Sequence, residues 1–190
     1  MKEVVVQLFS FDELGEEAKA RAIEDSRDIL TSDGWWSEST LAHWKEELLP
    51  EAGYEEAKIS FSGFGSQGDG ASFTAEVNLT TWFQKEDRAQ EYAALIGDPN
   101  INAHIFRANH YYVHEHTVDV EVIDEREESE EEELINQLRA EILADARKLA
   151  REIYQELEEE CEYNESDEAI ADVLRANDYY FLENGDFPNV

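Results

Sequence analysis

The amino-acid sequence predicts an α+β fold, with a mainly antiparallel sheet of two hairpins and terminal strands that helices cover, including one long C-terminal helix. Three observations lead to this prediction. Apolar and polar residues alternate on both sides of a glycine-rich segment within 59–82, the alternation returns within 101–123, and a helical apolar stripe runs over 134–157. Because no flexible linker or internal repeat divides the chain, we expect a single α+β domain over residues 1–190.

The first quarter of the chain is expected to form one strand and two helices. A β-branched run at 4–9 predicts an opening strand. A helix is expected over 10–30, since its first residues, a serine and a glutamate three positions apart, have capping-box spacing. A second helix is predicted over 37–49, where Pro50 and Gly53 should end it.

The two strands of the central hairpin are joined by the loop 63–70, in which glycine occupies four of eight positions. A tight hairpin turn needs only about two such residues. The extra glycines indicate positive φ angles or close approach to another group. We expect the loop residues Ser66, Gln67 and Asp69 to bond the tight backbone or a neighbouring element. The loop matches no phosphate-binding motif, because those motifs require a following helix.

The second half of the chain continues with alternating helical and extended patterns. A short helix is expected over 86–96, and the alternation over 101–123 predicts a pair of strands. Ser129 has capping-box spacing with the glutamate three residues later, which predicts the start of the long helix. A helix capped by Ser166 and a short aromatic strand at 179–181 complete the chain.

Two histidines, His114 and His116, are separated by one residue and would point from the same face of a strand. Ligand pairs of some metal-binding β folds have this spacing. Two ligands do not make a metal site, and Asp69 is the only further ligand we can name. The alternative is that both imidazoles lie at the solvent-exposed end of the sheet. We expect no cofactor and no catalytic residue, and keep a metal-binding protein or small hydrolase, centred on the SQGDG loop and the two histidines, as the alternative.

The charge of the chain restricts its partners. Asp and Glu number 47 against 15 Lys and Arg, and the formal net charge is −32. Such a surface repels nucleic acid and anionic membranes and attracts proteins with basic clefts. General solubility or adaptation to high salt would produce the same acidity. Cys161 is the only cysteine, which excludes an intramolecular disulfide, and no apolar run reaches about 18 residues, so we expect a cytoplasmic protein.

Several segments resemble those of a family of phage and prophage proteins. In chain order they are FDEL at 11–14, WW at 35–36, SGF at 62–64, SQGDGASF at 66–73, YYVH at 111–114, IYQELE at 153–158, SDEAI at 166–170 and NDYYFLENG at 177–185. The resemblance covers nearly the whole chain, and SQGDGASF is its specific part. The chain departs from the family pattern with Gly15 in place of a serine cap and with a short segment between Pro50 and Ile59.

The resemblance implies a role in conflict between phage and host. Members of the family are sometimes labelled antitoxins of a toxin–antitoxin stability system, and acidic phage proteins of this kind include inhibitors of CRISPR nucleases and restriction enzymes. Together with the charge, this leads us to expect a non-enzymatic inhibitor of a basic nucleic-acid-binding protein, namely a CRISPR effector, a restriction enzyme or a toxin. It would act in the host cytoplasm if a phage encodes it.

Glutamates along the long helix and the acidic run before it are the expected partner-binding residues. Carboxylates one to two helical turns apart lie about 5 to 11 Å from each other, which is comparable with phosphate separations. The residues expected to stand in for phosphates are Glu127, Glu128, Glu130, Glu131, Glu141, Asp145, Glu152, Glu156, Glu159 and Glu160. An ordinary solvated helix face would look the same. We expect no direct contact with nucleic acid or membrane, and the sequence leaves the oligomeric state open.

Overall fold

The computed structural model describes residues 5–85, 88–108, 111–126 and 131–188. Backbone contacts group the chain into two compact units: unit 1 comprises residues 1–38 and 159–190, and unit 2 comprises residues 39–158. Helices and antiparallel strands occur in both units, so the α+β fold class is confirmed. The single domain expected over the whole chain stays a prediction.

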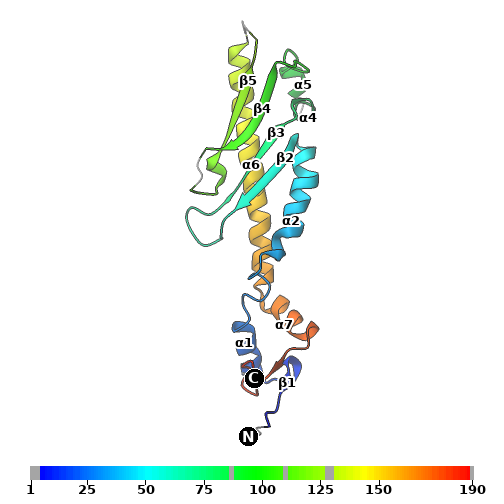
Figure 1. Cartoon of the computed structure of the whole chain (residues 1–190), viewed down its shortest axis with the longest axis vertical. Helices are drawn as coiled ribbons and strands as arrows, with labels where there is room; N and C mark the ends of the chain where they lie inside the picture. The colour runs from blue at the N-terminus through cyan, green and yellow to red at the C-terminus, as the bar shows by residue number, and fades with distance from the viewer. Residues whose placement is uncertain (1–4, 86–87, 109–110, 127–130, 189–190) are drawn as a thin grey trace, which may run out of the picture. The chain divides into compact units, whose positions relative to one another are not determined.

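Unit 2 contains a four-stranded antiparallel sheet in the order β2-β3-β4-β5 (Figure 1). The strands are β2 (Tyr54–Phe61), β3 (Ala71–Val77), β4 (Ile101–Arg107) and β5 (Val118–Asp124). Each strand pairs with the one before it in the chain, so the sheet is a meander. Both predicted hairpins are therefore confirmed, and the alternation of apolar residues defines which face of each strand is buried.

Helix α6 (Glu132–Asn164) is the long predicted helix and lies against one face of the sheet (Figure 1). Its fully buried residues recur every three or four positions, as an amphipathic helix requires. They are Leu138, Ile142, Ala146, Ala150, Ile153 and Leu157. The predicted stripe is thus confirmed at most of its positions, whereas Leu134 and Leu149 are only half-buried. The predicted cap at Ser129 lies outside the described residues.

A helical stretch precedes β2 and consists of α2 (Glu38–His43), the π-helical turn η3 (Trp44–Leu48) and α3 (Leu49–Glu51). We predict that Pro50 ends this helix, but it lies inside α3. Proline has no N–H for a carbonyl of the preceding turn, and the π-helical turn directly before it already departs from the regular α-helical pattern. Gly53 ends the stretch instead, at a φ of +90° that favours glycine.

Two short helices, α4 (Leu79–Phe83) and α5 (Arg88–Glu91), connect β3 to β4. The helix expected over 86–96 is confirmed only in part, because turns replace it after α5. Helix α4 was not expected. Its cap is Asn78, whose side chain accepts a hydrogen bond of 3.1 Å from the backbone N–H of Thr81.

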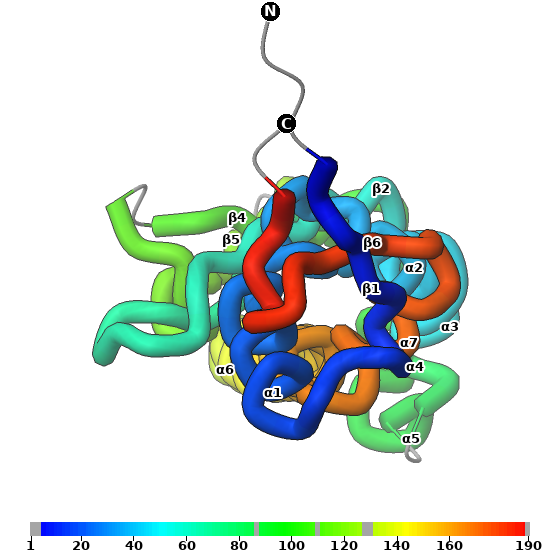
Figure 2. The backbone as a smooth tube through the Cα atoms, turned by 90° about the horizontal axis from the view of Figure 1, so that it is seen from below, coloured from blue at the N-terminus to red at the C-terminus, as the bar shows by residue number. Residues whose placement is uncertain are grey.

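Unit 1 is built from segments near both ends of the chain. Strand β1 (Phe9–Ser10) pairs antiparallel with β6 (Tyr180–Phe181), so the first and last described segments run side by side (Figure 2). Helices α1 (Glu16–Glu24) and α7 (Asp167–Ala176) pack with them around a small apolar core. The core residues are Phe11, Leu14, Ala18, Ala22, Ile170, Ala171, Leu174 and Phe181. Ser166 caps α7 as predicted, because its hydroxyl oxygen accepts a hydrogen bond of 3.2 Å from the backbone N–H of Ala169.

The N-terminal predictions need correction. The opening strand expected over 4–9 is reduced to two residues, and its described part before Phe9 is exposed and has no regular structure. The capping box is present, with Glu13 accepting from Ser10 N–H at 2.9 Å, but it closes only a 3₁₀ turn (η1, Phe11–Glu13). Leu14 then takes an extended conformation, Gly15 caps α1, and the helix ends at Glu24 rather than near residue 30.

We expect Gly185→Ala to destabilise unit 1 strongly. Gly185 has a φ of +90°, and an added Cβ would lie 2.2 Å from the carbonyl oxygen of Ala18. The loss of unfolding free energy should be about 3 kcal/mol, because both backbone strain and a clash with main chain result. Gly34 is a matched control in the same unit, with a φ of +75° and no neighbour within 4 Å. Gly34→Ala should cost about 1 kcal/mol. Urea unfolding followed by circular dichroism measures both, and equal losses would contradict the clash.

Candidate functional site

The glycine loop and the histidine segment meet at one corner of unit 2. An added Cβ would lie 2.8 Å from His114 Cα if placed on Gly70, and 3.2 Å from the Tyr112 ring if placed on Gly68. None of the four loop glycines has a positive φ. Of the two reasons considered for the extra glycines, close approach therefore applies to Gly68 and Gly70, and positive φ does not.

Asp69 organises the interior of this loop. Its Oδ2 atom accepts hydrogen bonds from the backbone N–H groups of Gly65 at 3.1 Å and Ser66 at 2.7 Å. The bonding expected of Asp69 is thus confirmed, and Ser66 takes part through its backbone. Gln67 is exposed. Asp69 does not join the histidines in a cluster of possible metal ligands, so the third ligand named from the sequence is not in place.

Helix α6 holds the first residues of the loop. The hydroxyl of Tyr154 donates to the carbonyl oxygen of Gly63 at 3.1 Å. The Tyr154 ring also packs on Phe64, with 5.2 Å between ring centroids, and Phe64 stacks on Phe61. The loop is thereby fixed at its first residues by α6 and at its last residues by the histidine segment.

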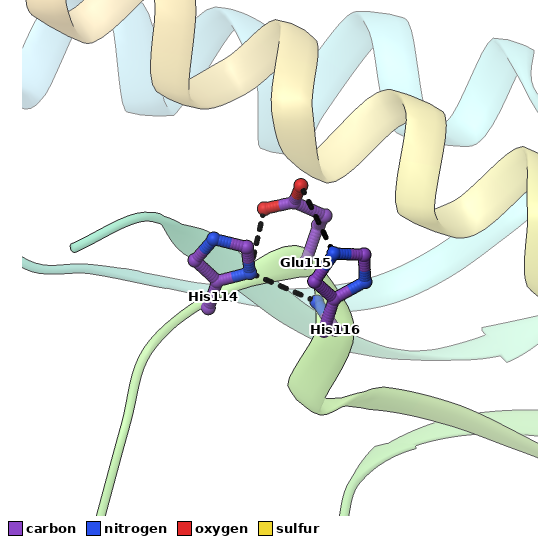
Figure 3. A group of neighbouring side chains, drawn as sticks. All are labelled: His114, Glu115 and His116. Atoms are coloured by element: carbon purple, nitrogen blue, oxygen red, sulfur yellow. Dashed lines mark hydrogen bonds and ion pairs between the residues drawn. The ribbon is translucent and has the colours of Figure 1, made fainter. Parts of the chain in front are cut away.

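The two histidines are not on a strand, so the expected placement on one strand face is wrong. His114 precedes the 3₁₀ turn η4 (Glu115–Thr117), and β5 begins only at Val118. The chain turns here because the carbonyl of His114 accepts from Thr117 N–H at 2.9 Å and from its hydroxyl at 2.7 Å. The turn nevertheless brings the rings of His114 and His116 into a stack at 4.9 Å, with Glu115 reaching toward α6 (Figure 3).

The electrostatics of this corner centre on Glu115. Its carboxylate oxygens lie 2.8 Å from His114 Nδ1, 3.9 Å from His116 Nε2 and 3.5 Å from Arg151 Nε of α6. His114, Glu115 and His116 each offer one possible metal-ligand atom, and these three atoms lie within 4.8 Å of one another. Such a group could hold a metal ion. The Arg151 charge opposes a cation at this place. His114 Nδ1 also lies 3.2 Å from His116 N–H, and it cannot accept that hydrogen bond while donating to Glu115.

Asp145, expected on the partner-binding surface, is the centre of an internal hydrogen-bond network. Its Oδ2 atom accepts from the hydroxyl of Tyr54 and from the indole N–H of Trp82, each at 3.1 Å. Arg88 Nη1 lies 3.5 Å away, and the Arg88 guanidinium covers the Trp82 ring at 3.9 Å. Burial, reinforced by the charge of Asp145, raises the pKa of Tyr54, so its hydroxyl stays protonated and donates.

Sequence reasoning missed the partners of Asp145. The signal that could have found them is its position, because Asp145 directly precedes Ala146 and follows Ile142 by three residues, both of which belong to the buried stripe. A carboxylate at the border of such a stripe needs hydrogen-bond donors from the elements packed against the helix. Buried Trp82 and Tyr54 are aromatic side chains whose polar atoms need such an acceptor.

The remaining expected partner-binding residues fall into different environments. Glu156 accepts from the indole N–H of Trp44 at 2.6 Å, and Glu131 lies 2.7 Å from Arg126 Nη1. Glu152 lies 3.7 Å from Lys148 Nζ. Glu141 is half-buried and accepts a hydrogen bond of 3.3 Å from the side chain of Gln137. Glu160 is half-buried, and Glu159 is exposed. Glu127, Glu128 and Glu130 lie outside the described residues. The structure thus divides these carboxylates into internal acceptors and surface charges.

Unit 2 is a two-layer α+β arrangement of a sheet and a long helix, and nothing among its described residues assigns a reaction. A family model described as "Domain of unknown function (DUF8835)" matches residues 35–167, so the chain belongs to this family. The matched range contains the whole of unit 2. No curated protein and no solved structure matches the chain. Within the described residues, no helix combines the length and apolar character that crossing a membrane requires.

We expect Asp145→Ala to destabilise unit 2 by about 3 kcal/mol, because the Tyr54 hydroxyl and the Trp82 indole lose their acceptor and Arg88 loses its ion pair. Glu152→Gln is the matched control on the same helix. Among the described residues its one ion pair is with exposed Lys148, so the loss should stay within about 0.5 kcal/mol. Guanidinium unfolding followed by tryptophan fluorescence measures both, and similar small losses would show that the network contributes nothing.

Proposed function

We propose that the chain is a non-enzymatic acidic protein that binds a basic nucleic-acid-binding protein, namely a CRISPR effector, restriction enzyme or toxin, and blocks its nucleic-acid site. The observation that carries the proposal is the excess of 47 acidic over 15 basic residues, combined with the structural use of several of the basic ones. The resemblance to acidic phage and prophage proteins supports it. The proposed place of action is the cytoplasm, of the host cell if a phage encodes the protein.

Several basic side chains of unit 2 serve its own structure. Arg139 and Arg147 of α6 donate to the carbonyl oxygens of Val120 and Val118 on β5, at 3.2 Å and 3.1 Å. These carbonyls belong to a strand at the edge of the sheet, where unpaired backbone groups would otherwise attract another chain. Arg126 joins the carboxylates of Asp124 and Glu131. Since these cations are engaged, many exposed carboxylates have no cation to neutralise them.

Helix α6 carries part of this charge. Its 33 residues span about 50 Å at 1.5 Å per residue. The residues with carboxylates turned to solvent along it include Glu132, Glu133, Glu159 and Glu162. A basic cleft that accommodates the regularly spaced phosphates of a nucleic acid also fits carboxylates at helical spacing. Asp145 and Glu156 contribute less to such binding, because the indole N–H groups hold them inside.

Salt dependence and charge removal test the proposal. We expect a partner captured from the native host to be released steeply between about 50 and 200 mM salt and to be displaced by duplex DNA, because both compete for the same cations. The triple variant Glu133→Gln, Glu152→Gln, Glu159→Gln should weaken capture at least tenfold, by removing charge from α6.

A control variant separates location from net charge. Glu46→Gln, Glu51→Gln, Glu76→Gln removes the same charge from exposed positions outside α6. It should leave capture within about twofold of the parent chain, since distant surface charges are screened. Binding that does not respond to salt, or that weakens equally in both variants, would remove the support for recognition by α6.

A second candidate function is metal binding or metal-dependent hydrolysis, favoured by the His114, Glu115 and His116 atoms within 4.8 Å beside the SQGDG loop. Elemental analysis of the purified protein separates the candidates. We expect no stoichiometric transition metal, because Arg151 lies 3.5 Å from the Glu115 carboxylate. A stoichiometric metal that is lost in the variant His114→Ala, His116→Ala would instead make metal binding the leading function.

A further inference from the structure

Two adjacent tyrosines of unit 2 are unusually exposed to solvent. Tyr111 is 93% exposed and Tyr112 is 60% exposed, whereas the next most exposed large apolar side chains in the described part of this unit are Ile96 at 41% and Ile123 at 39%. Both tyrosines precede η4, and their segment projects from the same side of unit 2 as the glycine loop (Figure 1, Figure 2). Aromatic rings held in solvent are enriched at protein binding surfaces.

The glycine loop supports these tyrosines from one side. The ring of Tyr112 lies so close to Gly68 that an added Cβ would be 3.2 Å from its Cδ1 atom. The hydroxyl oxygen of Ser62 accepts a hydrogen bond of 3.0 Å from Gly70 N–H and lies 3.4 Å from the carbonyl oxygen of Val113. The backbone next to Tyr112 is thus joined to the base of the loop. A ring held in place before binding loses little conformational freedom when a partner arrives.

The two segments carry few charges, and contacts within the protein engage them. Asp69 is the only charged residue within 59–75, and its carboxylate accepts hydrogen bonds from N–H groups of the loop. Glu115 is the only one within 111–117, apart from histidine, and its carboxylate lies 3.5 Å from Arg151 Nε. Although 33% of the chain is charged, the surface beside the tyrosines is therefore aromatic in character.

The electrostatic potential at this corner nevertheless favours a positive partner. Three carboxylates lie here, those of Asp69, Glu115 and Glu158, and Glu115 offsets the charge of Arg151. Burial, together with the negative charges of Glu158 and Asp69, raises the pKa of Tyr154, whose ring packs on the loop. The net charge of −32 makes a second copy of this chain an unfavourable occupant. Charge complementarity selects a basic protein instead.

Arginine is the basic side chain that suits exposed tyrosine rings. Its guanidinium group is planar and weakly hydrated, so it stacks on an aromatic face, whereas the ammonium group of lysine is compact and strongly hydrated. The protein uses the same contact internally, because the guanidinium of Arg88 lies 3.9 Å from the centre of the Trp82 ring. Two neighbouring rings can receive guanidinium groups from one extended segment of a partner.

We propose that Tyr111 and Tyr112 form a docking surface for an arginine-containing segment of a basic protein, with guanidinium groups stacked on the two rings. This inference rests on the proposed function, because it gives the same basic partner a second contact besides the glutamates of α6. The glutamates attract the partner over a distance, and the tyrosines add a short-range contact that distinguishes arginine from lysine.

Nuclear magnetic resonance titration of the full chain with a short synthetic peptide that contains two arginines tests this surface. We expect saturable amide shifts at 64–68 and 111–114. The same peptide with lysine in place of arginine should bind about fivefold more weakly, because an ammonium group does not stack on the rings. Shifts confined to other parts of the chain, or equal affinity for the two peptides, would overturn the surface.

Matched variants test the role of the rings. Tyr112→Ala should weaken binding of the arginine peptide about fivefold, whereas Tyr112→Phe keeps the ring and should stay within about twofold of the parent chain. Tyr163→Ala is the matched control, since Tyr163 is 62% exposed and belongs to unit 1. It should leave the affinity unchanged. Equal losses for Tyr112→Ala and Tyr163→Ala would contradict the surface.

A second variant covers the possibility that Tyr112→Ala disturbs the loop. Tyr111→Ala removes a ring that is 93% exposed, so the core should stay intact, and it should weaken the arginine peptide by a similar factor. Circular dichroism of each variant checks that the fold is retained. Unchanged affinity in folded Tyr111→Ala and Tyr112→Ala would overturn the proposal.

The docking surface and the proposed function fail in different ways. An arginine peptide that shifts only amides of α6 would overturn the tyrosine surface and leave recognition by the acidic helix standing. A peptide that binds at the tyrosines supports the surface even where capture of a host protein responds neither to salt nor to the glutamine variant of α6. That second result would contradict the proposed function alone.

Discussion

The arrangement of unit 2 depends on one carboxylate, that of Asp145. A single oxygen of this side chain receives the hydroxyl of a β2 residue, the indole of an α4 residue and the guanidinium of an α5 residue. The long helix is thereby tied to three elements that are far from it in sequence. Apolar packing along the buried stripe supplies most of the attraction between helix and sheet, but it is not directional. The two hydrogen bonds and the ion pair of Asp145 fix the rotation of the helix about its axis, because only one orientation satisfies all three partners.

The acidic character of the chain consequently has two physical roles. Asp145 and Glu156 each accept an indole N–H within unit 2, so their negative charge is part of the fold. Exposed carboxylates, of which Glu159 is one, belong to the solvated surface. Composition alone cannot separate these roles, because both use the same residue types. The separation requires knowledge of which aromatic side chains face the helix.

Local periodicity was sufficient to predict the parts of the fold that depend on neighbouring residues. The alternation around the glycine loop identified the hairpin. The apolar stripe containing Leu138 and Ile153 identified the helix. Both patterns arise because one face of the element is buried. Predictions failed where a distant or irregular contact decides the outcome. The π-helical turn before Pro50 keeps that helix intact, and the hydrogen bonds from Thr117 to His114 turn the chain where alternation indicated a strand. The candidate site was located by its glycines, but the role of Glu115 depends on Arg151, which only the folded chain brings near.

The composition of unit 1 has a consequence for how the protein is made. Strand β1 finds its only partner among the described strands in β6, near the opposite end of the chain, and the core around Phe11 and Leu14 is closed by Ile170 and Leu174. A ribosome releases the whole of unit 2 before the residues that complete unit 1 emerge. The core of unit 1 around Phe11 and Leu14 therefore cannot close before α7 and β6 have been synthesised, which happens after the whole of unit 2.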